Sequence, residues 1–188
     1  MVDFTNSQFN YRLISPLAGL DKPQVKGLMS LKAFLFVFCM VTIPVAAFAA
    51  ESVQITEQTE MNFAQVEIPT SGSKTIIINA STGAYSGTGT VQTGTPARGQ
   101  YKLRLSGSGS STSSTIDVQN ISSGNAAVTI STFTGNYNGA AISIPQSGLT
   151  KPAGGGGTTL YLGATATYTS SVPVGAITPS FDVVVTLQ

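Results

Sequence analysis

The sequence has 188 residues, of which 41% are hydrophobic and only 9% are charged, with nine Lys or Arg against eight Asp or Glu. A formal net charge of +1 provides no electrostatic footprint for nucleic acid. The chain has no His, which excludes Ser-His-Asp and Cys-His catalysis and any His-ligated zinc or iron site. We therefore expect a protein that is not an enzyme and that carries no cofactor or metal.

An apolar run from Ala33 to Phe48 follows Lys32 and ends in the small-residue sequence AFAAE. A basic residue, an apolar stretch and two small residues spaced by one are typical of a secretory signal peptide. The pattern predicts cleavage after Ala49 or Ala50, and hence export to the periplasm, the cell surface or the extracellular space. Met29 would make an ordinary start for this signal peptide. We assign residues 29–50 to a helical signal peptide and residues 1–28 to a non-structural N-terminal extension.

The apolar run has two other interpretations. With Ala49 and Ala50 included, the run reaches the lower length limit of a membrane-spanning helix, but an uncleaved anchor has no need of the small-residue pattern. A lipid attachment at Cys39 is disfavoured because Phe38 precedes it where a small residue is expected. Cleavage would remove Cys39, so the exported chain would have no disulfide and no contact with the membrane.

Residues 51–188 suit a single domain and read as strands separated by turns. Apolar residues alternate with polar ones, which is typical of strands with one buried face, and no helical periodicity survives the Gly, Ser and Thr content. The predicted strands, in chain order, lie around 53–55, 63–66, 75–79, 101–105, 116–118, 128–131, 160–167 and 181–187. The three isoleucines of 75–79 suggest a strand covered on both faces.

Turn signals between these segments favour an all-β fold, an antiparallel Ig-like β-sandwich. Asn138-Gly139 is typical of a type I′ hairpin turn, and the glycines of 154–157 suggest a flexible hairpin tip. A parallel β-helix is the alternative for a chain rich in Ser, Thr and Gly. That fold requires a fixed short repeat, and the sequence has none.

Candidate chemical motifs are weak. Ser71-Gly72-Ser73-Lys74 matches S-x-x-K formally but stands in a turn and lacks the partner motifs of that chemistry. The isolated carboxylates favour solvated surface charges over a catalytic pair or a calcium loop; they are Glu57, Glu60, Glu67, Asp117 and Asp182. Four tyrosines could stack on a sugar but fit partly buried sandwich positions better; they are Tyr85, Tyr137, Tyr161 and Tyr168.

The order of several short motifs resembles a bacterial domain-of-unknown-function family, number 4402. The motifs are MNFAQV (61–66), SGSKTI (71–76), PARGQY (96–101), LYLGATAT (160–167) and FDVVV (181–185). Ala64 stands where the family usually has Gly, and 177–180 replace its usual Tyr and Gly. The resemblance implies an exported, Ig-like, fimbria-like sandwich with no established catalytic residues.

Two functions from different classes follow. In the first, the chain is a non-catalytic cell-surface or fimbria-like structural protein whose partners are like subunits or a surface-assembly protein, joined by β-strand donation. The strand-pairing residues would be Val53 and Ile55 in a donor strand and, in an edge strand, Phe181, Val183, Val185 and Leu187. In the second, the sandwich is a self-contained secreted domain, adhesin-like, that binds a glycan or a protein through its loops.

Overall fold

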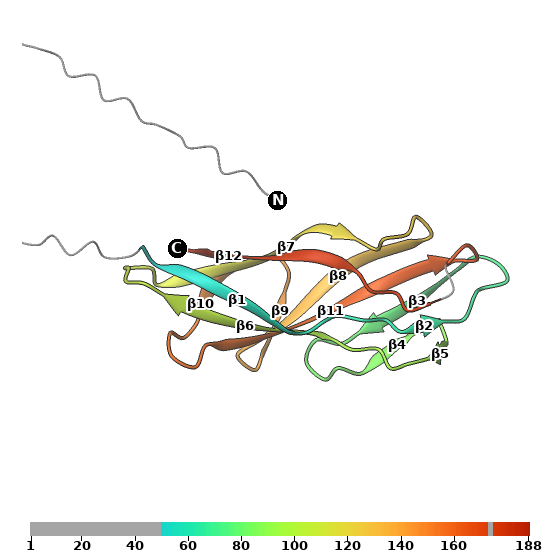
Figure 1. Cartoon of the computed structure of the whole chain (residues 1–188), viewed down its shortest axis with the longest axis horizontal. Helices are drawn as coiled ribbons and strands as arrows, with labels where there is room; N and C mark the ends of the chain where they lie inside the picture. Colours follow the sequence, from blue (N-terminus) through green and yellow to red (C-terminus); the bar gives the residue numbers. More distant parts are fainter. Residues whose placement is uncertain (1–49, 173–174) are drawn as a thin grey trace, which may run out of the picture. The chain divides into compact units, whose positions relative to one another are not determined.

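The fold is built from β-strands and turns, with no helix, across residues 50–172 and 175–188, the part of the chain that the computed structural model describes (Figure 1). The strands are β1 (Ser52–Thr59), β2 (Gln65–Val66), β3 (Ser73–Ile78), β4 (Tyr85–Gly87), β5 (Val91–Thr93), β6 (Gly99–Ser106), β7 (Ser113–Ser122), β8 (Val128–Tyr137), β9 (Ala140–Ser143), β10 (Gln146–Thr150), β11 (Thr158–Thr169) and β12 (Ser180–Leu187). Residues 1–49, which hold the predicted extension and nearly all of the predicted signal peptide, lie outside the described residues. Among the described residues, no helix is long and apolar enough to span a membrane.

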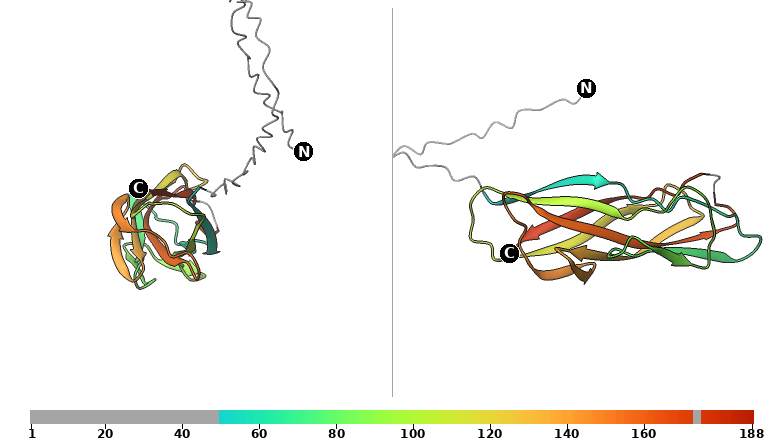
Figure 2. Two further views of the ribbon diagram at one scale, coloured as in Figure 1. Left: turned by 90° about the vertical axis from the view of Figure 1, so that its left-hand side faces the viewer. Right: turned by 90° about the horizontal axis from the view of Figure 1, so that it is seen from below.

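Two antiparallel sheets pack into a β-sandwich, which confirms the predicted all-β architecture (Figure 2). Strand β11 is the centre of the larger sheet and pairs with β8 along one edge. Along its other edge β11 pairs first with β6 and then with β3. Strands β1, β4 and β9 extend this sheet by pairing with β6, β3 and β8. The smaller sheet has the order β10-β7-β12, and β2 pairs with β5 in a separate short ladder.

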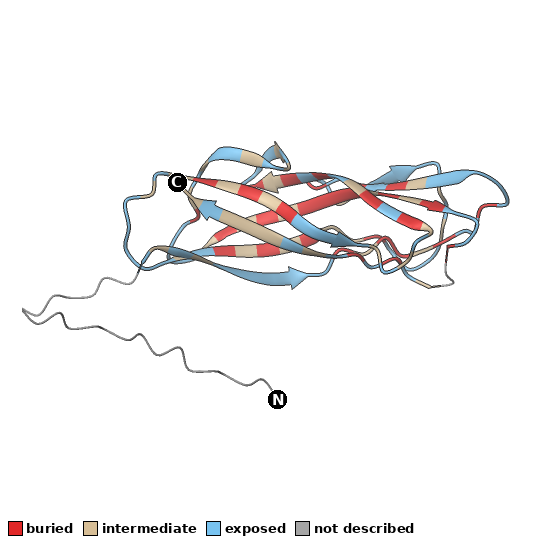
Figure 3. Ribbon diagram, turned by 90° about the horizontal axis from the view of Figure 1, so that it is seen from above, coloured by how far each residue is buried: buried red, intermediate tan, exposed pale blue. Residues whose placement is uncertain are grey.

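The core lies between the two sheets and is formed by alternate residues of the long strands (Figure 3). Inward residues of β11 are fully or almost fully buried, and so are Ile116 and Val118 of β7 on the opposite sheet. The alternation predicted for 101–105, 116–118, 128–131 and 160–167 is confirmed by this burial. Without a disulfide among these residues, apolar burial and the backbone ladders stabilise the sandwich.

Two predictions about local structure are wrong. Ile77 is not covered on both faces of its strand: Ile76 and Ile78 are buried, while Ile77 points outward and is 41% exposed. The glycines of 154–157 do not form a hairpin tip, because β10 and β11, which they connect, belong to different sheets. Alternation in the sequence identifies which face of a strand is buried. It does not identify the sheet to which the next strand along the chain belongs.

The hairpin turn between β8 and β9 is confirmed. Asn138 and Gly139 have φ angles of 52° and 85°, as a type I′ turn requires at both central positions. The pairing of Tyr137 with Ala140 closes the turn. The strand β9 that follows, like β4, β5 and β10, is short and was not predicted, because its residues lack a clear apolar alternation.

Ala64 adopts a backbone conformation that favours glycine, with a φ of 61°. Its amide donates a hydrogen bond to Oδ1 of Asn62, 2.6 Å away, which holds the turn that leads into β2. Glycine, which the resemblance led us to expect at this position, would adopt this conformation without strain.

We expect Ala64→Gly to raise the free energy of unfolding by roughly 0.5–1 kcal/mol, because it removes the clash of a Cβ in the left-handed region. Urea denaturation of the two proteins measures the difference. Ala141→Gly is the control: Ala141 lies in β9 with an ordinary strand φ, so glycine there should destabilise by a similar amount. A destabilised Ala64→Gly protein would contradict the account of this turn.

Candidate functional site

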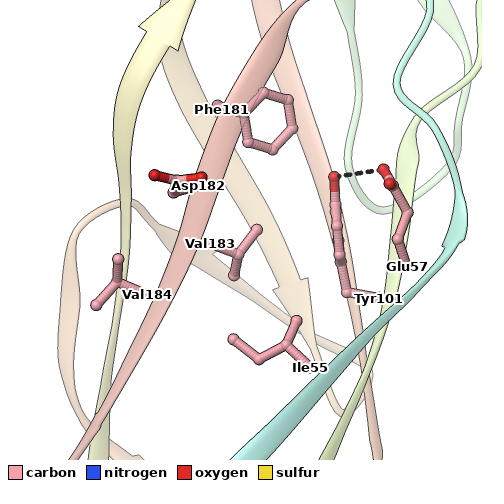
Figure 4. Close-up of a pocket in the computed structure, with 7 residues that line it drawn as sticks. All are labelled: Ile55, Glu57, Tyr101, Phe181, Asp182, Val183 and Val184. Atoms are coloured by element: carbon pink, nitrogen blue, oxygen red, sulfur yellow. Dashed lines mark hydrogen bonds between the residues drawn. The ribbon is translucent and has the colours of Figure 1, made fainter. Parts of the chain in front are cut away.

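The candidate site is a groove between β1 and β12, the free edges of the two sheets (Figure 4). Within the described residues, β1 pairs only with β6 and β12 only with β7, so each strand leaves one backbone edge without a ladder. The groove has a volume of about 480 Å³ and is lined by Ile55 and Glu57 of β1, Tyr101 of β6 and residues 181–184 of β12. We call it the β1–β12 groove. Unpaired edges of this kind are where a further strand can add.

Aromatic packing fixes the β12 side of the groove. The ring of Phe181 meets Phe133 of β8 edge-to-face with 5.1 Å between ring centroids, and Tyr101 of β6 at 6.2 Å. Phe181 thus ties β12 to two strands of the opposite sheet. In Figure 4, Val183 and Phe181 point toward Ile55 and Tyr101, whereas Asp182 and Val184 point away from the gap. The facing side chains give the groove an apolar floor.

Carboxylates line one end of the groove. The hydroxyl of Tyr101 donates a hydrogen bond to Oε1 of Glu57, 3.0 Å away, directly across the β1–β6 ladder. Burial raises the pKa of the Tyr101 hydroxyl well above its usual range, and the hydrogen bond to Glu57 raises this pKa further. A second hollow of about 160 Å³ continues the groove past Tyr101 and reaches Glu60. Tyr101 therefore stays neutral and acts as a hydrogen-bond donor to the carboxylate.

Strand β1 is held to the domain by one ladder and a few polar contacts. Every side chain of β1 except that of Val53 is exposed, and Figure 3 shows this strand, which continues from the grey trace, pale blue along almost its whole length. At its start, Nζ of Lys151 lies 2.8 Å from Oε1 of Glu51. This hydrogen bond, together with one from the Ser111 amide, lowers the pKa of the Glu51 carboxyl. Apolar burial contributes little to the attachment of β1.

The chain is anchored firmly just after β1. Met61 and Phe63 are completely buried in the core, and the amide of Phe63 donates to the carbonyl of Ile177 at 2.9 Å. Asn62 forms an isolated bridge with Ala97. Residues 51–60 precede this anchored segment, and we call them the arm; the side chain of Val53 is the one in β1 that is not exposed, and it packs against the core.

The structure brings the predicted strand-pairing residues together around one feature. Val53 and Ile55 lie on the inward face of β1, while β12 contributes four residues of its own inward face, all partly buried: Phe181, Val183, Val185 and Leu187. More than a hundred residues separate these two groups in the sequence, yet Ile55 lines the β1–β12 groove together with Phe181 and Val183. Val53, Val185 and Leu187 are not among the residues that line it. Their burial is incomplete because no strand covers the space between the two edges.

Four residues that line the groove were not among the predicted strand-pairing residues: Glu57, Tyr101, Asp182 and Val184. Glu57 was read as a solvated charge and Tyr101 only as a core residue. Glu57 follows Ile55 by two positions, so the period of the strand already places both on one face. The pairing of Glu57 with Tyr101, however, depends on the register of β1 against β6, for which the sequence has no local signal.

The other candidate motifs do not form sites. Tyr137 and Tyr168 are buried in the core, Tyr85 is exposed, and the ring of Tyr161 is covered by the Arg98 guanidinium, 3.6 Å from its centroid. The four tyrosines therefore form no common sugar-stacking surface. Ser71 and Lys74 flank a turn at Gly72 that leads into β3, not a helical turn. Across 50–172 and 175–188, no three His, Cys, Asp or Glu residues are grouped so that they could hold a metal ion.

Comparison with protein families gives a match that covers most of the chain. The matching model is described as "Domain of unknown function (DUF4402)" and spans residues 53–186, from the second residue of β1 to the last but one of β12. No curated protein and no solved structure matches the chain. The matched span includes both sides of the β1–β12 groove.

Proposed function

We propose, starting from the fact that this chain belongs to the DUF4402 family, that it is an exported, non-catalytic structural protein of the cell surface that assembles with like subunits by β-strand donation. In this scheme the arm 51–60 of one copy leaves its own β6 and pairs with β6 of the next copy. Export is supported by the signal-peptide pattern of 29–50, and the absence of His from the sequence supports a role without catalysis.

One observation carries the proposal: β1 is an edge strand joined by a single ladder, and its other edge borders the open β1–β12 groove. To leave, β1 has to break only its ladder with β6 and the few polar contacts at its ends. A strand paired on both sides, such as β11, would have to break ladders on both edges. The arm is thus the long element of the sandwich whose departure breaks the fewest interactions.

Exchange would restore every interaction that the departure breaks. The donated strand has the same sequence, so the Glu57–Tyr101 hydrogen bond, the Gln58–Gln100 hydrogen bond and the Glu51–Lys151 ion pair all re-form between neighbouring copies. Swapping an identical element between copies is a low-cost route to association for this reason. Each copy donates one arm and accepts another, so the contact is head-to-tail and extends into a chain of subunits.

The proposal is tested with a variant that lacks residues 51–59 and with a free peptide of sequence SVQITEQT, which corresponds to β1. The peptide should bind the vacated β6 edge and raise the Tm of the variant, equivalent to about 2.7 kcal/mol at a hundredfold excess over Kd. The control peptide carries Asp in place of Val53 and Ile55, which removes the apolar contacts with the groove. The proposal fails if neither the variant nor the full domain shows a shift with the β1 peptide at large excess.

The second candidate is a self-contained secreted domain that binds a glycan or a protein. The observation that favours it is that β1 already pairs with β6 of its own chain in register from Ser52 to Glu57, so β6 needs no strand from another copy. Under this alternative the arm stays in place, and the protein remains a stable monomer at high concentration. The behaviour of the arm therefore separates the two functions.

A further inference from the structure

Basic residues gather on the outer face of the larger sheet. Lys102 and Arg104 point outward from β6, since Tyr101 and Leu103 are buried, and Arg98 immediately precedes this strand. Residues two apart on a strand lie about 7 Å from each other, so the backbone from Arg98 to Arg104 extends along a line roughly 20 Å long. The guanidinium of Arg98 turns toward β11 and covers the ring of Tyr161. The paired residues beside them are uncharged: Gln54 and Thr56 of β1 on one side and Thr159 of β11 on the other. We call this line the basic strip.

Among the residues that the structure describes, no carboxylate forms an ion pair with the basic strip. Nε of Arg104 donates to the Gly154 carbonyl at 2.9 Å, and Nζ of Lys102 lies 3.5 Å from the hydroxyl of Thr159. Arg98 donates to the Ala80 carbonyl at 2.7 Å and covers the ring of Tyr161. The one ion pair among the residues that the structure describes joins Lys151 and Glu51, away from the strip. Three positive charges thus remain available to an outside anion.

The outer face of the smaller sheet carries the opposite charge. Asp117 of β7 and Asp182 of β12 both point outward, since Ile116, Val118 and Phe181 turn toward the core. Asn120 Nδ2 donates to Asp182 at 2.6 Å, and Gln119 Nε2 donates to Asp117 at 2.9 Å. Strands β7, β10 and β12 contain no Lys or Arg. The two carboxylates, which we call the acidic pair, have only neutral partners.

We infer that copies of this protein pack side by side, with the basic strip of one copy against the acidic pair of the next. The two outer faces of a sandwich point in opposite directions, so one copy presents a positive face and a negative face at once. A symmetric contact would place like charges on each other, which charge repulsion disfavours. The contact is therefore heterologous and can repeat from copy to copy. It does not require the arm to leave its own β6, so it does not depend on strand donation, although Asp182 also borders the β1–β12 groove.

The strength of such a contact is limited by solvent. Exposed ion pairs each contribute little and are screened by salt over about 8–10 Å at physiological ionic strength. A single pair of copies therefore associates weakly and reversibly. Copies already linked in a row present many strips to many acidic pairs at once, and these weak contacts then add. The contact specifies how neighbouring rows align rather than holding one row together.

Charge reversal in the full exported domain tests the inference, with sedimentation velocity measuring self-association in about 20 mM and about 500 mM NaCl. The wild type should self-associate at low salt and lose at least roughly tenfold in association constant at high salt. Lys102→Glu with Arg104→Glu makes both faces negative, and Asp117→Lys with Asp182→Lys makes both faces positive. Each double variant alone should lose the salt-sensitive part of the self-association, which depends on these charges. Mixed in equal amounts, they should associate again, because each now meets a face of opposite charge.

Lys74→Glu is the matched control for a single Arg104→Glu reversal, since both change the net charge by the same amount and Lys74 lies off the basic strip. The control should associate like the wild type, and Arg104→Glu should associate less. Matching thermal melts would verify that the variants fold. The inference is overturned if the mixture of the two double variants does not regain the salt-sensitive association. It is also overturned if reversing the basic strip weakens the association and reversing the acidic pair does not. Peptide binding at β6 would be unaffected by either result.

Discussion

Replacing Gly163 by Ala should lower the free energy of unfolding by about 3 kcal/mol, one of the largest effects that a single methyl group can have in this protein. Gly163 is buried in the middle of β11, where the end of β3 approaches it. A Cβ at this position would overlap the carbonyl oxygen of Ile78 and lie 2.7 Å from the amide nitrogen of Ala80. Both atoms belong to the backbone, so neither can move aside as a flexible side chain could. Urea denaturation measures the loss.

Gly155→Ala is the control for this prediction, because a Cβ on Gly155 would meet nothing within 4 Å. It should change the free energy of unfolding by no more than about 0.5 kcal/mol. If the two substitutions destabilise equally, the close approach of β3 to β11 is not a determinant of stability. One edge of β11 pairs with β6 in its first half and with β3 in its second half, and this change of partner would then need another explanation.

Val183→Asp should destabilise the domain by about 2 kcal/mol or more, whereas Thr186→Asp should stay within about 0.5 kcal/mol. Val183 is partly buried against the core on the inward face of β12, and Thr186 is exposed on the outward face. A carboxylate at position 183 would replace apolar contacts with the core. It would also lie in the groove that Glu57 lines, and the two negative charges would repel each other. Thermal melts of the two variants measure the contrast. Equal losses would show that the register assigned to β12 is wrong.

The long strands could be predicted because each buries one face and leaves the other in water. Leu160, Leu162 and Ala166 alternate with polar residues, and a period of two is a local property that survives without knowledge of the partner strand. The turn at Asn138-Gly139 was predictable for a similar reason, since its backbone conformation selects these two residues. Ile77 misled the prediction because an isoleucine on an exposed face has the same sequence signal as a buried one.

The groove could be predicted in its parts but not in its assembly. Val53, Ile55 and Phe181 were recognised as inward residues of terminal strands. The free edges of these two strands lie beside each other only because of the way the two sheets pack together. This packing is a long-range property of the topology. The segregation of Arg104 and Asp182 onto opposite outer faces could not be predicted either, because it requires the sheet to which each strand belongs.

The central claim is that the arm of one copy pairs with β6 of another, and a pair of cysteines tests it directly. Ser52 and Ser106 are partners across the β1–β6 ladder and both are exposed. The sequence after Ala50 has no cysteine, so Ser52→Cys with Ser106→Cys offers one disulfide at a distance that antiparallel partners satisfy.

The measurement is a denaturing, non-reducing gel of this variant after assembly at high concentration and then oxidation. Strand donation predicts a ladder at multiples of the subunit mass, because each disulfide joins the arm of one copy to the next. It also predicts that oxidation of the dilute monomer before concentration locks the arm in place and prevents assembly. A single band at the monomer mass from assembled protein, or assembly undiminished after locking, would contradict strand donation and favour the self-contained domain.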